Sequence, residues 1–170
     1  MTTMTTPAQL SHQLREVQTE DLSRRRLVVG LSLLGAAMGQ IVSLYQMGII
    51  KRLPDPPLDI FDSSKVDAAP YAYSRAQTPD AVAMIVNYGI TAWLAAAGDQ
   101  DRATHTPWLP IALAAKTITD AATALELGRE EYASTKKLCF YCQVATVVSL
   151  ASVVVALPEA RKAWGAWRGK

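Results

Sequence analysis

Two stretches of the sequence carry no charged side chain and are long enough to cross a membrane as helices. They cover Leu27 to Ile50 and Leu138 to Leu157. A helix of about 20 apolar residues spans the hydrocarbon core of a bilayer, so both stretches predict membrane helices. Small residues in the first, such as Gly35 and Gly39, favour close contact with a neighbouring helix. Buried helices of a soluble protein remain an alternative, because the mean hydropathy of the chain is only mildly positive.

Two further stretches are apolar but shorter or less uniform, and they cover Ala81 to Gly98 and Pro107 to Leu127. The latter contains Lys116 and Asp120, which share a helix face because they are four residues apart. A charge within a membrane is costly unless it is paired or faces a cavity. The two residues therefore mark a polar site inside the protein, a pair near a helix end, or a helix that only skims the membrane interface.

Four apolar stretches in a chain of 170 residues predict one all-α domain, an integral membrane four-helix bundle over residues 24–160. The first stretch is too long for a cleaved signal peptide, and no convincing small-residue cleavage site follows it. Residues 1–23 are polar and are expected to form a flexible tail, with a short amphipathic helix as the alternative. Residues 161–170 form a basic C-terminal tail.

The segment 51–79, between the first two stretches, combines prolines and acids with apolar and aromatic residues. Proline interrupts helices, yet there is too much apolar surface here for a solvated linker. We expect a long, ordered extracytoplasmic loop with short helical pieces, lying over one end of the bundle. Asp62, Ser63 and Ser64 are suited to cap one such piece, because a short polar side chain accepts from free helix N–H groups.

The basic residues favour one orientation in the membrane. An even number of spans puts both termini on one side, together with Arg24–Arg26 and the basic tail. Because basic residues beside spans stay preferentially in the cytoplasm, we expect a multi-pass inner-membrane protein with cytoplasmic termini and Cys139 near the outer face. Apart from the lipid bilayer, the net charge of +2 indicates no large electrostatic partner such as nucleic acid.

The only cysteines of the chain, Cys139 and Cys142, form a C-x-x-C motif where the fourth stretch begins. Two thiols one helical turn apart can form a reversible disulfide. Free N–H groups at a helix start lower a thiol pKa, and Lys136 and Lys137 add positive charge. We therefore expect a catalytic redox pair, with two inert buried cysteines as the alternative.

The position of the motif at the mouth of a membrane helix suggests an electron acceptor dissolved in the bilayer, such as a quinone. Phe140 and Tyr141 are expected to line its approach, and Asn87 is a polar candidate for binding it within the second stretch. A zinc site needs four ligands, and His12 and His105 lie far from the cysteines in polar segments. We therefore expect no metal.

The pattern resembles the vitamin K epoxide reductase family, in its bacterial type, from about Leu27 to Ala160. The resemblance rests on the four stretches, the long first loop and the sequence Cys-Phe-Tyr-Cys that opens the last helix. In addition, the loop segment 66–72 and Thr78-Pro79 are similar to the family's approach to its second helix.

The resemblance implies a helical bundle around a quinone, ubiquinone or menaquinone, that acts as co-substrate. It also implies that the C-x-x-C pair passes electrons between the quinone and a protein thiol, often of a thioredoxin-like partner. When the family's roles are placed on the matching residues of this sequence, Cys142 faces the quinone and Cys139 exchanges its disulfide with the partner thiol. The quinone's hydrogen-bond donor falls at Asp80, and a polar residue one turn beyond the second cysteine falls at Thr146.

The chain also departs from the family. Members commonly have two loop cysteines that relay electrons to the C-x-x-C pair, but this loop has none, and Ser63 stands about where the second is expected. Ala69 replaces a residue that is usually polar. The leading hypothesis is a quinone-linked thiol oxidoreductase. The alternatives are a non-catalytic membrane sensor of redox state or quinone, an assembly protein, or a helical scaffold with inert cysteines.

Overall fold

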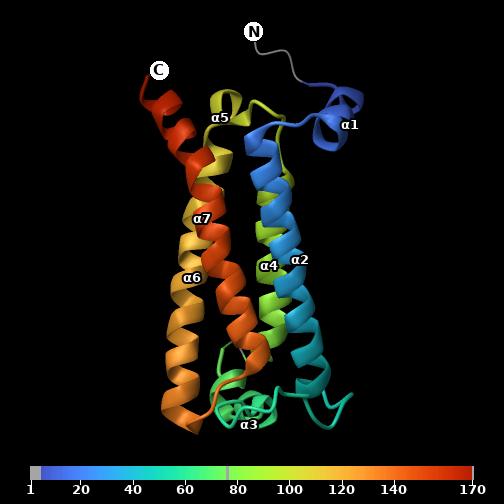
Figure 1. The fold of residues 1–170 in the computed structure, drawn as a ribbon, viewed down its shortest axis with the longest axis vertical. Helices are drawn as coiled ribbons and strands as arrows, with labels where there is room; N and C mark the ends of the chain where they lie inside the picture. The colour runs from blue at the N-terminus through green and yellow to red at the C-terminus, as the bar shows by residue number, and fades with distance from the viewer. Residues whose placement is uncertain (1–4, 76, 170) are drawn as a thin grey trace.

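The computed structural model describes residues 5–75 and 77–169, and these residues form helices without a β-strand. Four long helices run side by side along the long axis of the molecule (Figure 1). They are α2 (Glu20–Gln46), α4 (Asp80–Ala96), α6 (Trp108–Thr135) and α7 (Phe140–Arg168). The all-α prediction is therefore confirmed.

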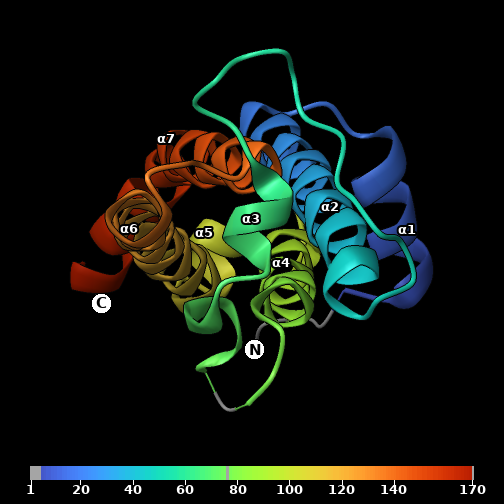
Figure 2. The ribbon, with the colours of Figure 1, turned by 90° about the horizontal axis from the view of Figure 1, so that it is seen from below.

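Short helices lie at both ends of these four. α1 (Pro7–Glu16) and α5 (Arg102–His105) lie at the end where the chain starts and finishes (Figure 1). At the other end, α3 (Ser63–Asp67) lies across the ends of the long helices (Figure 2). The 3-10 helix η1 (Pro70–Tyr73) follows it. Asp62 caps α3 as expected, because its side chain accepts from the N–H group of Lys65 at 3.0 Å.

α1 occupies part of the segment that was expected to be a flexible tail, so the structure shows the alternative, a short helix. Thr6 and Gln9 form a capping box, in which the side chain of each accepts from the backbone N–H of the other. This reciprocal pair satisfies two N–H groups that lack a partner within the helix. α2 then begins at Glu20, earlier than the apolar stretch that predicted it.

α2 and α4 approach closely at two glycines. A Cβ atom on Gly35 would lie 2.4 Å from Cζ of Tyr88, and one on Gly39 would lie 3.1 Å from the carbonyl oxygen of Ala81. The Tyr88 ring of α4 lies against Gly35. Its hydroxyl donates to the carbonyl oxygen of Ala145 on α7 at 2.7 Å. Small residues thus allow α2, α4 and α7 to meet, as expected for close helix packing.

α2 and α7 are each long and apolar enough to cross a membrane. α4 is apolar but has 17 residues. α7 continues through Pro158 to Arg168, although the sequence predicted its end near Leu157. Proline usually breaks a helix, but α7 continues past Pro158, and the next residue, Glu159, pairs with Arg102 in the interior.

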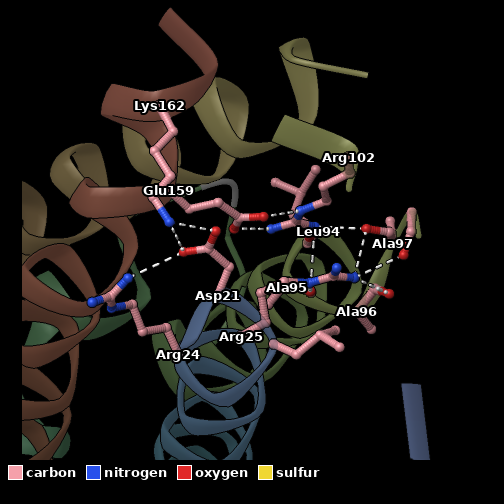
Figure 3. Close-up of polar contacts among 12 residues, drawn as sticks. Asp21, Arg24, Arg25, Leu94, Ala95, Ala96, Ala97, Arg102, Glu159 and Lys162 are labelled. Carbon is pink, nitrogen blue, oxygen red and sulfur yellow. Dashed lines mark hydrogen bonds and ion pairs between the residues drawn. The ribbon is translucent and has the colours of Figure 1, made fainter. Parts of the chain in front are cut away.

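Two buried arginines close the end of α4 (Figure 3). The guanidinium of Arg25, on α2, donates to a series of carbonyl oxygens at 2.8 to 3.0 Å, those of Ala95, Ala96, Ala97, Gly98 and Asp99. The last carbonyls of a helix lack partners within it and carry partial negative charge. The sequence suggested only a topology signal at Arg24–Arg26, whereas Arg25 is a structural cap.

Arg102, on α5, completes this end of the molecule. Its guanidinium donates to Leu94 O at 2.7 Å and Ala97 O at 2.6 Å, and it also holds both carboxylate oxygens of Glu159 at 2.8 Å. The side chains of Arg102 and Glu159 are 0% and 3% exposed. The pair therefore ties α4, α5 and α7 together inside the protein (Figure 3).

Candidate functional site

The C-x-x-C motif opens α7 at the end of the molecule opposite the termini. α6 ends at Thr135 because Lys136 adopts a left-handed conformation with φ of 57°, which turns the chain toward the motif. Cys139 is the N-cap residue of α7, and its Sγ accepts from the N–H group of Cys142 at 3.3 Å. Both cysteines are free thiols. The expected helix start at the motif is confirmed.

The loop between α2 and α4 covers the motif. Backbone hydrogen bonds join Leu138 to Ile60 and Asp62, and the ring of Phe61 packs edge-on against Phe140 with 5.6 Å between centroids. The hydroxyl of Tyr141 donates to Pro54 O at 2.7 Å. These contacts leave Cys139 with 0% exposure.

Ser63 lies at the centre of this cover. Its Oγ accepts from the N–H group of Phe140 at 2.9 Å and donates to Asp55 Oδ1 at 2.5 Å. The side chain thus satisfies one of the free N–H groups at the start of α7. The residue that stands where the family's second loop cysteine is expected therefore holds the loop on the motif through hydrogen bonds.

Two buried carboxyl groups flank the thiols. Asp67, the last residue of α3, is 1% exposed. Its carboxylate and both cysteine sulfurs lie within 4.8 Å of one another. On the other side, Glu131 Oε2 accepts from the N–H group of Cys139 at 3.3 Å and from Gln143 Nε2 at 3.1 Å. No pattern in the sequence singled out either acid, because both meet the motif through tertiary contacts.

The charge around Cys139 differs from the expectation. Burial raises the pKa of the Cys139 thiol above its ordinary value, and the nearby Asp67 raises it further. The two lysines expected to add positive charge lie elsewhere, since Lys136 stacks over the Tyr132 ring and Lys137 donates to Asp59 O. The expectation that the helix start, helped by these lysines, lowers the pKa of this thiol is therefore not met.

The pKa of Asp67 also changes. Burial raises the pKa of this carboxyl from an ordinary 3.8 to about 7, and the acids around it add to that effect. An isolated carboxylate is costly to keep in a low-dielectric interior, so the neutral form is favoured. Near neutral pH, Asp67 therefore populates both its protonated and its ionised form beside the thiols.

A cavity of about 400 Å³ lies beside Cys142, between α2, α4, α6 and α7. Four residues of the predicted site line it: Asp80, Asn87, Cys142 and Thr146. Phe140 and Tyr141 lie instead under the loop, on the Cys139 side, where Tyr141 bonds Pro54 and Phe140 packs on Phe61. The structure thus gathers the polar candidates around the cavity and separates the two aromatic ones from it.

Three of these lining residues already have partners within the protein. Asp80 Oδ1 accepts from Gln46 Nε2 at 2.7 Å, at the junction of α2 and α4. Thr146 Oγ1 donates to the carbonyl oxygen of Cys142 at 2.9 Å. Asn87 Oδ1 accepts from Lys116 Nζ at 2.7 Å. A bound molecule would therefore meet groups whose orientation is already fixed.

Lys116 and Asp120 line the same cavity farther along α6. Their charged atoms are 2.6 Å apart, and Lys116 Nζ also contacts Thr91 Oγ1 at 3.2 Å. Their side chains are 19% and 10% exposed. The structure favours the polar site inside the protein, because Asn87 and Thr91 of α4 together provide hydrogen-bonding partners for both charges.

One group of side chains among the described residues could hold a metal ion: Asp67, Cys139 and Cys142. Two thiolates and one carboxylate suit zinc in donor type, but a structural zinc site needs four ligands. The same two sulfurs are also close enough in sequence and space for redox chemistry. Among the described residues the group is one donor short of such a zinc site, whereas the two sulfurs suit a dithiol–disulfide couple.

Comparison with known families gives a match over most of the chain. Residues 26–157 match the model of the vitamin K epoxide reductase family. A search of curated proteins finds no match. The matched range starts within α2, includes the covering loop and the cavity, and ends within α7 after both cysteines.

Proposed function

We propose that this chain, which belongs to the vitamin K epoxide reductase family, is a quinone-linked thiol oxidoreductase whose redox centre is the Cys139–Cys142 pair. Family membership and the two apolar helices α2 and α7 make it a membrane protein. The family also indicates thiol–disulfide oxidoreductase chemistry with a quinone as electron partner and, in general, thioredoxin-like protein partners. The assignment of these roles to individual residues is our proposal.

The observation that carries the proposal is the position of the two sulfurs on opposite sides of the motif. Cys142 lines the cavity between the long helices, whereas Cys139 lies under the loop. A quinone in the cavity takes two electrons and two protons when Cys139 and Cys142 become a disulfide. A protein dithiol on the loop side returns the pair to thiols and is itself oxidised to a disulfide.

The loop must move for this second exchange. With Cys139 at 0% exposure, a partner thiol reaches its sulfur only after the segment around Pro54 and Ser63 lifts from α7. The chain lacks a cysteine in that segment, so no internal thiol relays the electrons. We therefore infer that the partner engages Cys139 directly, in an open form of the loop.

The arrangement of the termini supports the proposed orientation. The N- and C-terminal ends lie at one end of the molecule and the covered motif at the other (Figure 1). An inner-membrane protein with cytoplasmic termini would present the motif and its loop at the outer face. A reporter fused after the last residue that appears outside the cell would contradict this orientation.

The test is quinone reduction by the purified protein in lipid nanodiscs, with dithiothreitol as electron donor and ubiquinone or menaquinone as acceptor. The wild type is expected to form many quinols per protein, and Cys139→Ser and Cys142→Ser to form none, because each removes one half of the disulfide. Ser43→Ala, on α2 away from the cavity, is the matched control. Reduction that stops after one quinol per protein would indicate a sensor instead.

A further inference from the structure

We propose that Asp67 is a catalytic residue that exchanges a proton with the Cys139 thiol during disulfide exchange. This inference rests on the proposed thiol oxidoreductase function and assigns a proton-transfer group to it. An oxygen of the Asp67 carboxyl group lies within 4.8 Å of the Cys139 sulfur. The Oδ2 atom of Asp67 is buried and has no hydrogen-bond partner among the residues described.

A buried polar atom without a partner is rare in folded proteins and calls for an explanation. No cation of the described chain satisfies Asp67: Lys65, on the same short helix, reaches across to Thr135 O at 3.0 Å. The other acids near the motif have partners, since Asp55 holds Ser63 and Glu131 holds the N–H group of Cys139. Among these acids, Asp67 is thus the one that lies beside the sulfurs with a buried oxygen that has no partner among the described residues.

The geometry places the Asp67 carboxyl group beside the two thiols. The carboxylate lies within 4.8 Å of both Sγ atoms, and the loop shields the site from bulk water, with Cys139 at 0% exposure. In the closed form, a proton that Cys139 Sγ releases or takes up therefore has the Asp67 carboxyl group as its neighbouring acceptor or donor.

The step balances as follows. A partner dithiol is first bound to Cys139 through one sulfur, and its second thiolate attacks that sulfur. The S–S bond within the partner forms, the bond to Cys139 Sγ breaks, and the electron pair stays on Cys139 Sγ. As the loop closes over the sulfur, Asp67 gives it a proton, and a proton from solvent, equivalent to the one lost by the partner's second thiol, restores the Asp67 carboxylic acid.

The ionisation of Asp67 suits this role. Its pKa of about 7 makes both forms available near neutral pH, and a proton-transfer group works best when its pKa lies near the working pH. The raised pKa of the Cys139 thiol means that few thiolates form unaided. A neighbouring base is therefore of most use to this sulfur.

The test compares Asp67→Asn and Asp67→Glu with the wild type in nanodiscs. The control is Asp59→Asn, an exposed acid on the same loop. Quinone reduction driven by dithiothreitol is measured from pH 5.5 to 9. Loss of a general acid–base group typically costs a factor of 10² or more, so we expect Asp67→Asn to be ~100-fold slower at pH 7. Asp67→Glu should recover at least part of the rate, and Asp59→Asn should be unchanged.

The alkylation rate of Cys139 at pH 7, measured in a Cys142→Ser background, separates this role from a purely electrostatic one. If Asp67 were only a negative neighbour, its replacement by Asn would lower the thiol pKa and speed alkylation. If it accepts the proton, the same change slows alkylation. Faster or equal alkylation in Asp67→Asn would therefore overturn the proposal.

The proposal about Asp67 can still be tested if the wild type reduces no quinone or if Asp67→Asn does not fold. If the wild type reduces no quinone, the proposed function fails, while the alkylation comparison still tests Asp67. If Asp67→Asn does not fold, infrared difference spectra of the wild type with isotope-labelled aspartate give the answer. A protonated aspartate band that changes between the dithiol and disulfide forms supports the proposal, and its absence overturns it.

Discussion

Arg102 and Glu159 form a two-pronged ion pair, with both contacts at 2.8 Å, in the interior where α4, α5 and α7 meet. Removal of one partner from a buried pair leaves an uncompensated charge and costs roughly 3–5 kcal/mol. We therefore expect Glu159→Leu to lower the stability of the protein by about that amount, as measured by thermal unfolding in detergent.

The matched control for this change lies one turn further along α7. Lys162 pairs with Asp21 on α2 at 2.8 Å but is 55% exposed, and surface pairs contribute at most ~1 kcal/mol. Lys162→Ala should therefore unfold almost like the wild type. If both variants lost the same amount of stability, the buried pair would contribute no more to stability than the exposed one.

The contact between Gly35 and Tyr88 predicts a second stability effect. A Cβ atom on Gly35 would overlap the Tyr88 ring at 2.4 Å, so Gly35→Ala forces α2 and α4 apart or displaces the ring. Overpacking of this kind costs about 1–3 kcal/mol. Gly30→Ala, on the same helix with nothing within 4 Å of its Cβ position, should be neutral or stabilising because alanine favours helix. Thermal unfolding of both variants is the measurement.

The cover over Cys139 predicts how fast reagents reach that thiol. The Tyr141 hydroxyl fastens the loop at Pro54 O, and a hydrogen bond contributes about 1 kcal/mol, equivalent to a 5-fold change in an opening equilibrium. In a Cys142→Ser background, Tyr141→Phe should increase maleimide labelling of Cys139 about 5-fold. Tyr132→Phe, which alters an exposed tyrosine on α6, should not. Equal rates in the two variants would mean that the loop opens elsewhere.

The buried Asp67 makes the stability of the reduced protein depend on pH. In the folded protein its pKa is about 7, whereas in the unfolded chain it is about 3.9. The folded state therefore binds the extra proton between these values, and its stability falls as pH rises from about 4 through 7, then levels off. Asp67→Asn should remove this part of the dependence. Denaturant unfolding at several pH values checks the difference between the two proteins.

Local signals allowed part of the fold and site to be predicted. The apolar stretches placed α2, α4 and α7 approximately, the Asp62 cap marked α3, and the cysteine spacing marked the motif. Each of these follows from residues close together in the sequence. The all-α class and the family followed from their order.

The remaining features depend on contacts between distant residues. Glu159, just beyond Pro158 on α7, meets Arg102 from α5, and Arg25 is a helix cap because the end of α4 lies beside it. Lys136 and Lys137 lie next to Cys139 in sequence, yet their side chains point to Tyr132 and Asp59. The acid that does reach the thiols, Asp67, comes from a helix more than seventy residues earlier in the chain.

The burial of Cys139 beneath the loop limits how fast small thiols outside the protein can exchange with the cysteine pair. Small thiols that circulate outside the protein collide mostly with the closed form, so they equilibrate with the pair only as fast as the loop opens. Under the proposed function, the pair would hold an oxidation state set by the quinone through Cys142, even when the surrounding thiol pool is more reducing. Slow exchange of this kind would let one disulfide connect the membrane quinones with a protein partner, while small thiols outside the protein do not equilibrate with the quinones through it.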